Sequence, residues 1–150
     1  MRLKSVITVA LAVGLLVLTG GLIEANIAGS AHDFSAETWN TGGEICQPCH
    51  TPHAGDTTIS DAPLWNHEVT AVAAYTLYNS STMDSAPGQP DGRSRLCLSC
   101  HDGTVALDAF GGAAGTTLIG AVNADAEVGT DLGDDHPVGM DFTAAIASAD

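Results

Sequence analysis

Two short motifs hold all four cysteines of the chain, and both have the same spacing. The motifs are CQPCH, residues 46–50, and CLSCH, residues 97–101. In each, the cysteines are three positions apart and a histidine follows the second cysteine directly. Residues three apart lie on one face of a helical turn, so the two thiols of a motif can reach the same edge of one ligand.

Three other uses of paired cysteines fit these motifs less well. Four cysteines in an exported chain suggest disulfide bonds, but a disulfide has no use for the histidine that follows each pair. Paired zinc-binding motifs usually lie about 15–20 residues apart, whereas 47 residues separate Cys49 from Cys97. A redox-active pair would need a thioredoxin-like βαβ unit, and the sequence has no such pattern.

Covalent attachment of haem accounts for every position of both motifs. The thiols form thioether bonds to the two vinyl groups on one edge of the porphyrin, and the histidine lies beneath the iron as the proximal ligand. The sequence therefore predicts two haem c groups, with His50 and His101 as proximal ligands. The cysteines predicted to form the thioether bonds are Cys46, Cys49, Cys97 and Cys100.

Four further histidines are available for the two remaining axial positions of the irons. In order of preference, the predicted distal ligands are His53, His136, His67 and His32. Because histidine is in surplus, we expect bis-histidine coordination. The alternative axial ligands, which would raise the reduction potential, are Met83 and Met140.

His53 lies too close to the first motif to serve the haem bound there. It leaves the chain three positions after His50, from the same side of the turn, and Pro52 should end that turn at Thr51. We therefore expect His53 to point away from this haem. If His53 binds iron, the iron belongs to the second haem of the chain or to a neighbouring molecule.

The N-terminus has the order of a secretory signal peptide. A basic start, MRLK, precedes an apolar run from Val6 to Ile23, and the small residues ANIAGSA follow. We expect cleavage after Ala31, one haem-binding domain over residues 32–150, and export to the periplasm or the cell exterior, with no membrane contact after cleavage. The alternative is that the apolar run stays as a membrane anchor.

The mature chain would be strongly acidic and poor in large apolar side chains. It has two basic residues, Arg93 and Arg95, and 17 aspartates and glutamates, which gives a net charge of −15. This charge argues against binding to nucleic acid or anionic lipid. Leu, Ile, Val and Phe make up 20 of its 119 residues, a fraction at which a highly charged chain is expected to be disordered. Two haem groups would supply the missing core.

The elements around the motifs are expected to be short. HEVTAVAAYTLY, residues 67–78, has apolar residues at helical spacing and predicts a short helix. SAPGQPDGRS, residues 85–94, has the composition of a loop. The apolar stretch VALDAFGGAAGTTLIGAV, residues 105–122, is expected to pack against a haem face.

Several segments together resemble the doubled-CXXCH family of multihaem c-type cytochromes. They are CHTPHAG, PLWNH, YTLYNSSTMD and RLCLSCHDGTVA, and HDFS and DHPVG fit the same pattern. The resemblance extends from His32 to about Phe142. It implies a mostly irregular fold with short α-helices and little β-sheet, organised around two covalent haems, and a role in respiratory electron transfer.

The resemblance also suggests how copies of the chain connect. Some multihaem cytochromes with a CXXCHxxH motif form extracellular filaments, in which the second histidine ligates a haem of the next subunit, and His53 matches that position. The implied protein is an electron carrier rather than an enzyme. Its partners would be other copies of itself and other redox cytochromes. The alternatives are a monomeric periplasmic electron shuttle and a haem reductase or peroxidase.

Overall fold

The computed structural model describes residues 26–59, 62, 64–83 and 85–140. By its internal contacts the chain divides into two units, Met1–Asp33 and Phe34–Asp150. Within the first unit, the described residues form hydrogen-bonded turns around Ser30. The apolar run of the predicted signal peptide lies outside the described residues. No helix in the described part of the chain is long and apolar enough to span a membrane.

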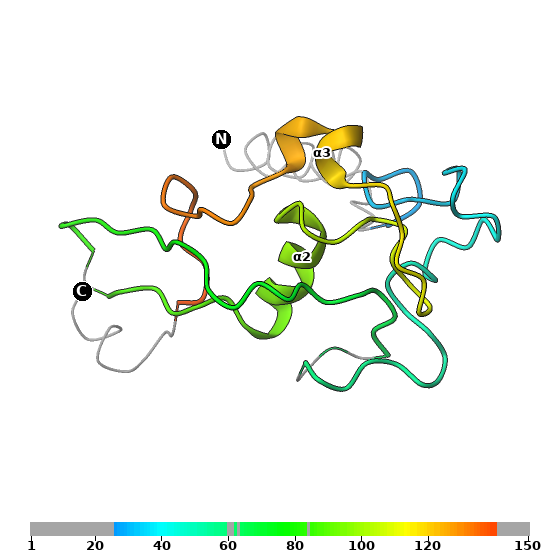
Figure 1. Ribbon diagram of the computed structural model, residues 1–150, viewed down its shortest axis with the longest axis horizontal. Coiled ribbons are helices and arrows are strands. Elements are labelled where there is room, and N and C mark those ends of the chain that lie inside the picture. Colours follow the sequence, from blue (N-terminus) through cyan, green and yellow to red (C-terminus); the bar gives the residue numbers. More distant parts are fainter. Residues whose placement is uncertain (1–25, 60–61, 63, 84, 141–150) are drawn as a thin grey trace, which may run out of the picture. The chain divides into compact units, whose positions relative to one another are not determined.

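Most of the second unit is irregular or extended chain. Its described residues contain two short α-helices, α2 (Gly92–His101) and α3 (Ile119–Val122), and one 3-10 helix, η1 (Ala124–Ala126) (Figure 1). Pairing between extended segments within these residues amounts to isolated bridges. The prediction of a mostly irregular fold with short helices and little β-sheet is confirmed.

Helix α2 contains the whole second motif. Its buried side chains are those of Leu96, Leu98 and Ser99. The helix ends after His101, where Gly103 takes a positive φ of 74° and donates its N–H to the Cys100 carbonyl at 3.2 Å. Glycine is the usual residue at such a left-handed helix end because it has no Cβ to clash.

The helix predicted over residues 67–78 is wrong, because this segment is extended. Side chains of α2 form hydrogen bonds with the backbone of residues 67–78, in place of the bonds that a helical turn would form within the segment. Arg95 Nη2 donates to the Thr70 carbonyl at 2.9 Å and to the Val72 carbonyl at 3.2 Å, and Ser99 Oγ accepts the Thr70 N–H at 3.0 Å. Threonine, valine and tyrosine also favour extended backbone.

The extended segment supplies the central residue of the hydrophobic core. Tyr75 packs with Leu98 of α2 and with Leu132 in a buried cluster. The side-chain amide of Gln89 pairs with the Tyr75 backbone in both directions, accepting the N–H at 2.8 Å and donating to the carbonyl at 3.0 Å. The position of Tyr75 is therefore determined by its backbone as well as by its ring.

A buried hydrogen-bond network joins Tyr75 to the end of α2. The Tyr75 hydroxyl donates to Asp102 Oδ2 at 2.6 Å, and Asp102 Oδ1 accepts from the N–H and hydroxyl of Thr104 at 2.8 and 2.7 Å. Burial by itself would raise the pKa of Asp102, but the hydrogen bonds from Tyr75, Thr104 and Thr70 outweigh it and lower that pKa. Burial and the bond to Asp102 raise the pKa of Tyr75 to about 12.

Replacing Tyr75 with Phe removes the donor to a buried carboxylate. We expect the free energy of unfolding of the mature protein to fall by about 1.5–3 kcal/mol, the usual value of a hydrogen bond to a charged group. Chemical denaturation at neutral pH measures it. Tyr78→Phe is the matched control, because the Tyr78 hydroxyl forms no hydrogen bond with the described residues. Equal losses in the two variants would contradict this role for the Tyr75 hydroxyl.

The same pair of variants has a distinct signature at high pH. Because the folded-state pKa of Tyr75 is raised to about 12, the stabilisation from its neutral phenol is complete below the ordinary tyrosine pKa of about 10 and is lost as pH rises through the folded-state value. The wild-type protein should lose this component of stability over that interval, and Tyr75→Phe should not.

Candidate functional site

The first motif forms a single helical turn. Cys49 N–H and His50 N–H both donate to the Cys46 carbonyl, at 3.2 and 2.8 Å. The turn ends there, because Thr51 N–H donates to the Leu64 carbonyl of a distant segment at 2.8 Å. Cys46 is exposed and Cys49 is half-buried, and neither forms a disulfide. The two thiols of this motif are thus one turn apart and available for covalent attachment.

The second motif occupies the C-terminal end of α2 and repeats this arrangement. Cys97 is exposed and Cys100 is half-buried, and neither forms a disulfide. Burial, and then the negative charges of Cys49, Asp102 and Cys97, raise the pKa of Cys100 to about 12. A thiol with a raised pKa stays neutral, unlike the thiolates of redox and nucleophilic cysteines. Since Cys49 acts on Cys100 electrostatically, the two motifs lie near each other.

One strap, residues 64–70, connects the two motifs, and it is extended after Leu64, whose φ is 52°. Near its start, Asn66 N–H donates to the Cys49 carbonyl at 2.9 Å. At its end, Thr70 N–H donates to Ser99 Oγ of α2 at 3.0 Å. The strap is therefore bonded to the first motif at one end and to the second at the other.

His67, in the middle of the strap, is buried between the motifs with 4% of its surface exposed. Its Nδ1 lies 2.8 Å from the Glu68 carbonyl, so a proton on Nδ1 would be donated there and Nε2 would remain available to a metal. Nε2 lies 3.6 Å from Cys100 Sγ. His67 is thus directed at the thiol of the second motif.

Trp65 lies two positions before His67, on the same side of the extended strap. Its ring makes edge contacts with His50, at 5.8 Å between centroids, and with His67, at 6.4 Å. The indole N–H is buried and has no hydrogen-bond partner among the described residues. No hydrogen bond from a described residue therefore orients the indole, and its ring contacts with His50 and His67 do.

His101, the predicted proximal ligand of the second motif, is oriented by residues 126–129. Its Nδ1 lies 2.7 Å from the Ala126 carbonyl. Its own carbonyl accepts the N–H groups of Val128 and Gly129, at 2.8 and 3.3 Å. A histidine that donates from Nδ1 to a carbonyl presents Nε2 to a metal, which is the usual arrangement of metal-ligating histidines.

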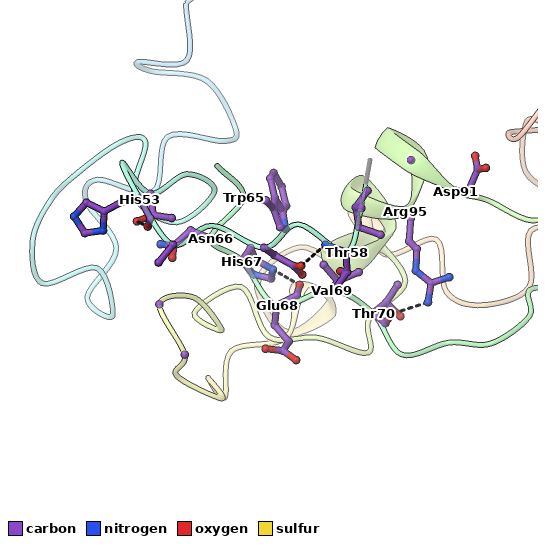
Figure 2. A pocket seen from close by; sticks show the side chains of 17 residues that line it. His53, Thr58, Trp65, Asn66, His67, Glu68, Val69, Thr70, Asp91 and Arg95 are labelled. Atoms are coloured by element: carbon purple, nitrogen blue, oxygen red, sulfur yellow. Dashed lines mark hydrogen bonds between the residues drawn. The ribbon is translucent and has the colours of Figure 1, made fainter. Parts of the chain in front are cut away.

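The other three histidines predicted as distal ligands lie on the surface. His53 is exposed, and its ring points away from Trp65 and His67 (Figure 2). His136 is exposed as well, and His32 is exposed in the first unit. Of the two alternative methionine ligands, Met83 is half-buried and Met140 is exposed.

Large cavities accompany a small hydrophobic core in the second unit. One cavity of about 1060 Å³ is lined by His53, Trp65, His67 and Arg95, among others (Figure 2). A second cavity, of about 840 Å³, is lined by Leu64 and other residues. Both are open to solvent rather than enclosed, so they are hollows at the surface and not voids in the core. The buried hydrophobic side chains are Ala62, Tyr75, Leu96, Leu98, Ala106, Leu107, Ala109, Ile119 and Leu132.

The residues present fit a haem at each motif. Each motif offers two thiols one turn apart that form no disulfide, and the Nδ1 contact of His101 with the Ala126 carbonyl is of the kind that orients a metal-ligating histidine. Among the described residues, no three His, Cys, Asp or Glu side chains gather into a group that could hold a metal ion by themselves. A haem iron needs fewer ligands from the protein, because the porphyrin supplies its equatorial ligands and the chain supplies only the axial ones.

Comparison of the chain with models of known protein families finds no matching family. A comparison with curated proteins finds no match either. The function of the site is therefore inferred from the chemistry and geometry of its own residues.

Sequence reasoning missed two groups that shape the site. Trp65 was recognised only as part of the PLWNH segment, and the Ala126 carbonyl was not foreseen as a partner of His101. Trp65 precedes His67 by two residues, and side chains two positions apart lie on one side of an extended strand. The sequence therefore carries a signal for Trp65, but only if the segment is predicted to be extended and not helical. A backbone carbonyl carries no signal in the sequence.

Proposed function

We propose that this protein is an exported dihaem c-type cytochrome that carries electrons and has no enzymatic reaction of its own. The observation that supports it most directly is the pairing of two CXXCH motifs, each on a helical turn, within one unit and on either side of His67. The resemblance to the doubled-CXXCH family points to the same function. Each covalently bound haem would supply a one-electron iron couple.

The residues that would hold the haems divide by role. Cys46 and Cys49 would form the thioether bonds of the first site, and Cys97 and Cys100 those of the second. The proximal ligands would be His50 and His101, and the Ala126 carbonyl would orient the second of these through Nδ1.

His67 is our first choice for one of the two distal positions. It is the buried member of the distal candidates among the described residues, and it lies beside the second motif. This preference differs from the order drawn from the sequence, in which His53 and His136 came first. Histidine on both faces of an iron closes it to substrate, which favours electron transfer over a reductase or peroxidase.

The charge of the mature chain suits this role and indicates the kind of partner. A net charge of −15 would steer a basic surface of another redox protein toward it and would slow its encounter with acidic ones. We propose that the mature protein acts in the periplasm or outside the cell, after removal of residues 1–31. Its redox partners would be other cytochromes.

The haem content tests the proposal directly. Expressed with export in a host that attaches haem c, the mature protein should carry two covalent haems, measured by intact mass and by the pyridine haemochrome spectrum. Cys97→Ser with Cys100→Ser should leave one haem, and the same double replacement at Cys46 and Cys49 should leave the other. A wild-type protein without covalent haem would contradict the proposal.

Replacing His67 with Ala tests its role as a distal ligand. Removal of an axial ligand leaves an open position, so the reduced variant should bind carbon monoxide at one iron more than wild type in the same state of assembly. The shift of the Soret band measures it. The assignment fails if His32→Ala or His136→Ala gains this binding and His67→Ala does not. Rapid binding at both irons of assembled wild type would favour a reductase or peroxidase.

We also propose that His53 ligates an iron in a neighbouring copy, so that the protein forms electron-conducting filaments. The supporting observation is that His53 is exposed and its ring points away from the strap (Figure 2). A ligand so placed is presented to another molecule more readily than to the haem at its own motif. A chain that stays monomeric would instead act as a diffusing periplasmic shuttle.

Replacing His53 with Ala should dissolve such filaments, because the cross-subunit bond is lost. Electron microscopy of natively exported, haem-loaded protein measures the outcome. His136→Ala is the matched control, since His136 is also an exposed histidine on a loop. Filaments that persist in His53→Ala, or that disappear only in His136→Ala, would contradict this role for His53. Dispersed particles in the wild type would favour the shuttle.

A further inference from the structure

We propose that Trp65 is a shared positioning residue, a single indole that fixes the ring planes of His50 and His67 and so couples the geometry of the two haem sites. The inference rests on the proposed function, which makes these histidines axial ligands. It adds a residue outside the two CXXCH motifs, one that the haem-attachment pattern does not contain.

The backbone around Trp65 is bonded on both sides to the loop that carries the first motif. Asp56 N–H donates to the Trp65 carbonyl at 2.7 Å, and Asn66 N–H donates to the Cys49 carbonyl at 2.9 Å. Trp65 also forms isolated bridges with His50 and with Asp56. These bonds fix the position of the Trp65 backbone relative to the loop that carries His50.

The ring contacts of Trp65 restrict orientation as well as distance. The planes of Trp65 and His50 meet at 90° in an edge-to-face contact. The planes of Trp65 and His67 meet at 61°, again as an edge contact. Edge-to-face pairs have preferred angles, so a rotation of the indole would change the setting of both imidazoles.

The chain of contacts continues from Trp65 to the second motif. His67 is held by its Nδ1 contact with the Glu68 carbonyl at 2.8 Å, and its Nε2 lies 3.6 Å from Cys100 Sγ. Contacts thus run from the proximal histidine of the first motif through Trp65 and His67 to a cysteine of the second. The indole makes ring contacts with both of these histidines.

The partnerless indole N–H supports a packing role for this residue. The nitrogen is buried and no acceptor among the described residues reaches it, so no hydrogen bond to those residues determines where the ring lies. The planar surface of the indole is then the feature that acts on its neighbours. Interactions around an axial ligand tune ligand orientation and reduction potential.

Electron paramagnetic resonance of the oxidised, haem-loaded protein tests this inference, because the g values of low-spin ferric haem report the orientation of the axial imidazole planes. In Trp65→Leu, the g values of both haems and both midpoint potentials should shift. Trp65→Phe keeps an aromatic ring and should shift them less, and it serves as the test if the leucine variant does not fold. Trp39→Leu is the matched control, since Trp39 contacts Phe34 and Phe110.

The outcomes separate this inference from the proposed function. Haem content is measured first, and a wild type without two covalent haems refutes the proposed function. With two haems bound, unchanged g values and potentials in both Trp65 variants overturn the inference alone. A shift at one haem only also overturns it, because the residue would then not be shared. Equal shifts in Trp39→Leu would show a general loosening of the fold and would overturn it too.

Discussion

The second unit depends on side chains of α2 that satisfy the backbone of an extended segment. Arg95 binds the carbonyls of Thr70 and Val72, and Ser99 binds the Thr70 N–H. An extended segment without a full neighbouring strand would otherwise leave these polar groups without partners, at a cost comparable to a lost hydrogen bond for each buried group. These contacts attach residues 67–78 to the helix that carries the second motif.

This attachment brings the two motifs together. The strap is bonded to the first motif through Asn66 and to α2 through Thr70, so its middle residues lie between them. His67 lies in that middle, and Trp65 lies next to Asn66 at the end bonded to the first motif. A short connection of this kind would hold the two proposed haems at a small separation, and electron tunnelling falls steeply with distance. The fold thus holds the two motifs close together with little regular secondary structure.

The half-buried thiol of each motif differs from a redox or catalytic thiol. Burial raises the pKa of Cys49 and of Cys100, whereas thiols that act as nucleophiles or redox agents have lowered pKa values. The hydrophobic core is small and the neighbouring cavities are large. A chain of this composition and charge gains little from its own side chains, and the proposed haems would supply apolar surface in their place.

The sequence by itself determined the residue types and local spacings of the candidate site. Two cysteines and a histidine on one turn follow from chain geometry alone, and the structure has each thiol pair on such a turn. The sparse apolar content likewise predicted an irregular fold with short helices. These features depend on residues close together in the chain, where local conformation decides the outcome.

The tertiary structure decided which distant groups meet. Periodicity assigned residues 67–78 to a helix, but hydrogen bonds from Arg95 and Ser99 stabilise an extended backbone there. That change places Trp65 and His67 on one side of a strap, buries His67 beside Cys100, and leaves His53 exposed. No local pattern encodes these pairings, because each depends on backbone groups and side chains that lie far apart in sequence and become neighbours only when the chain folds.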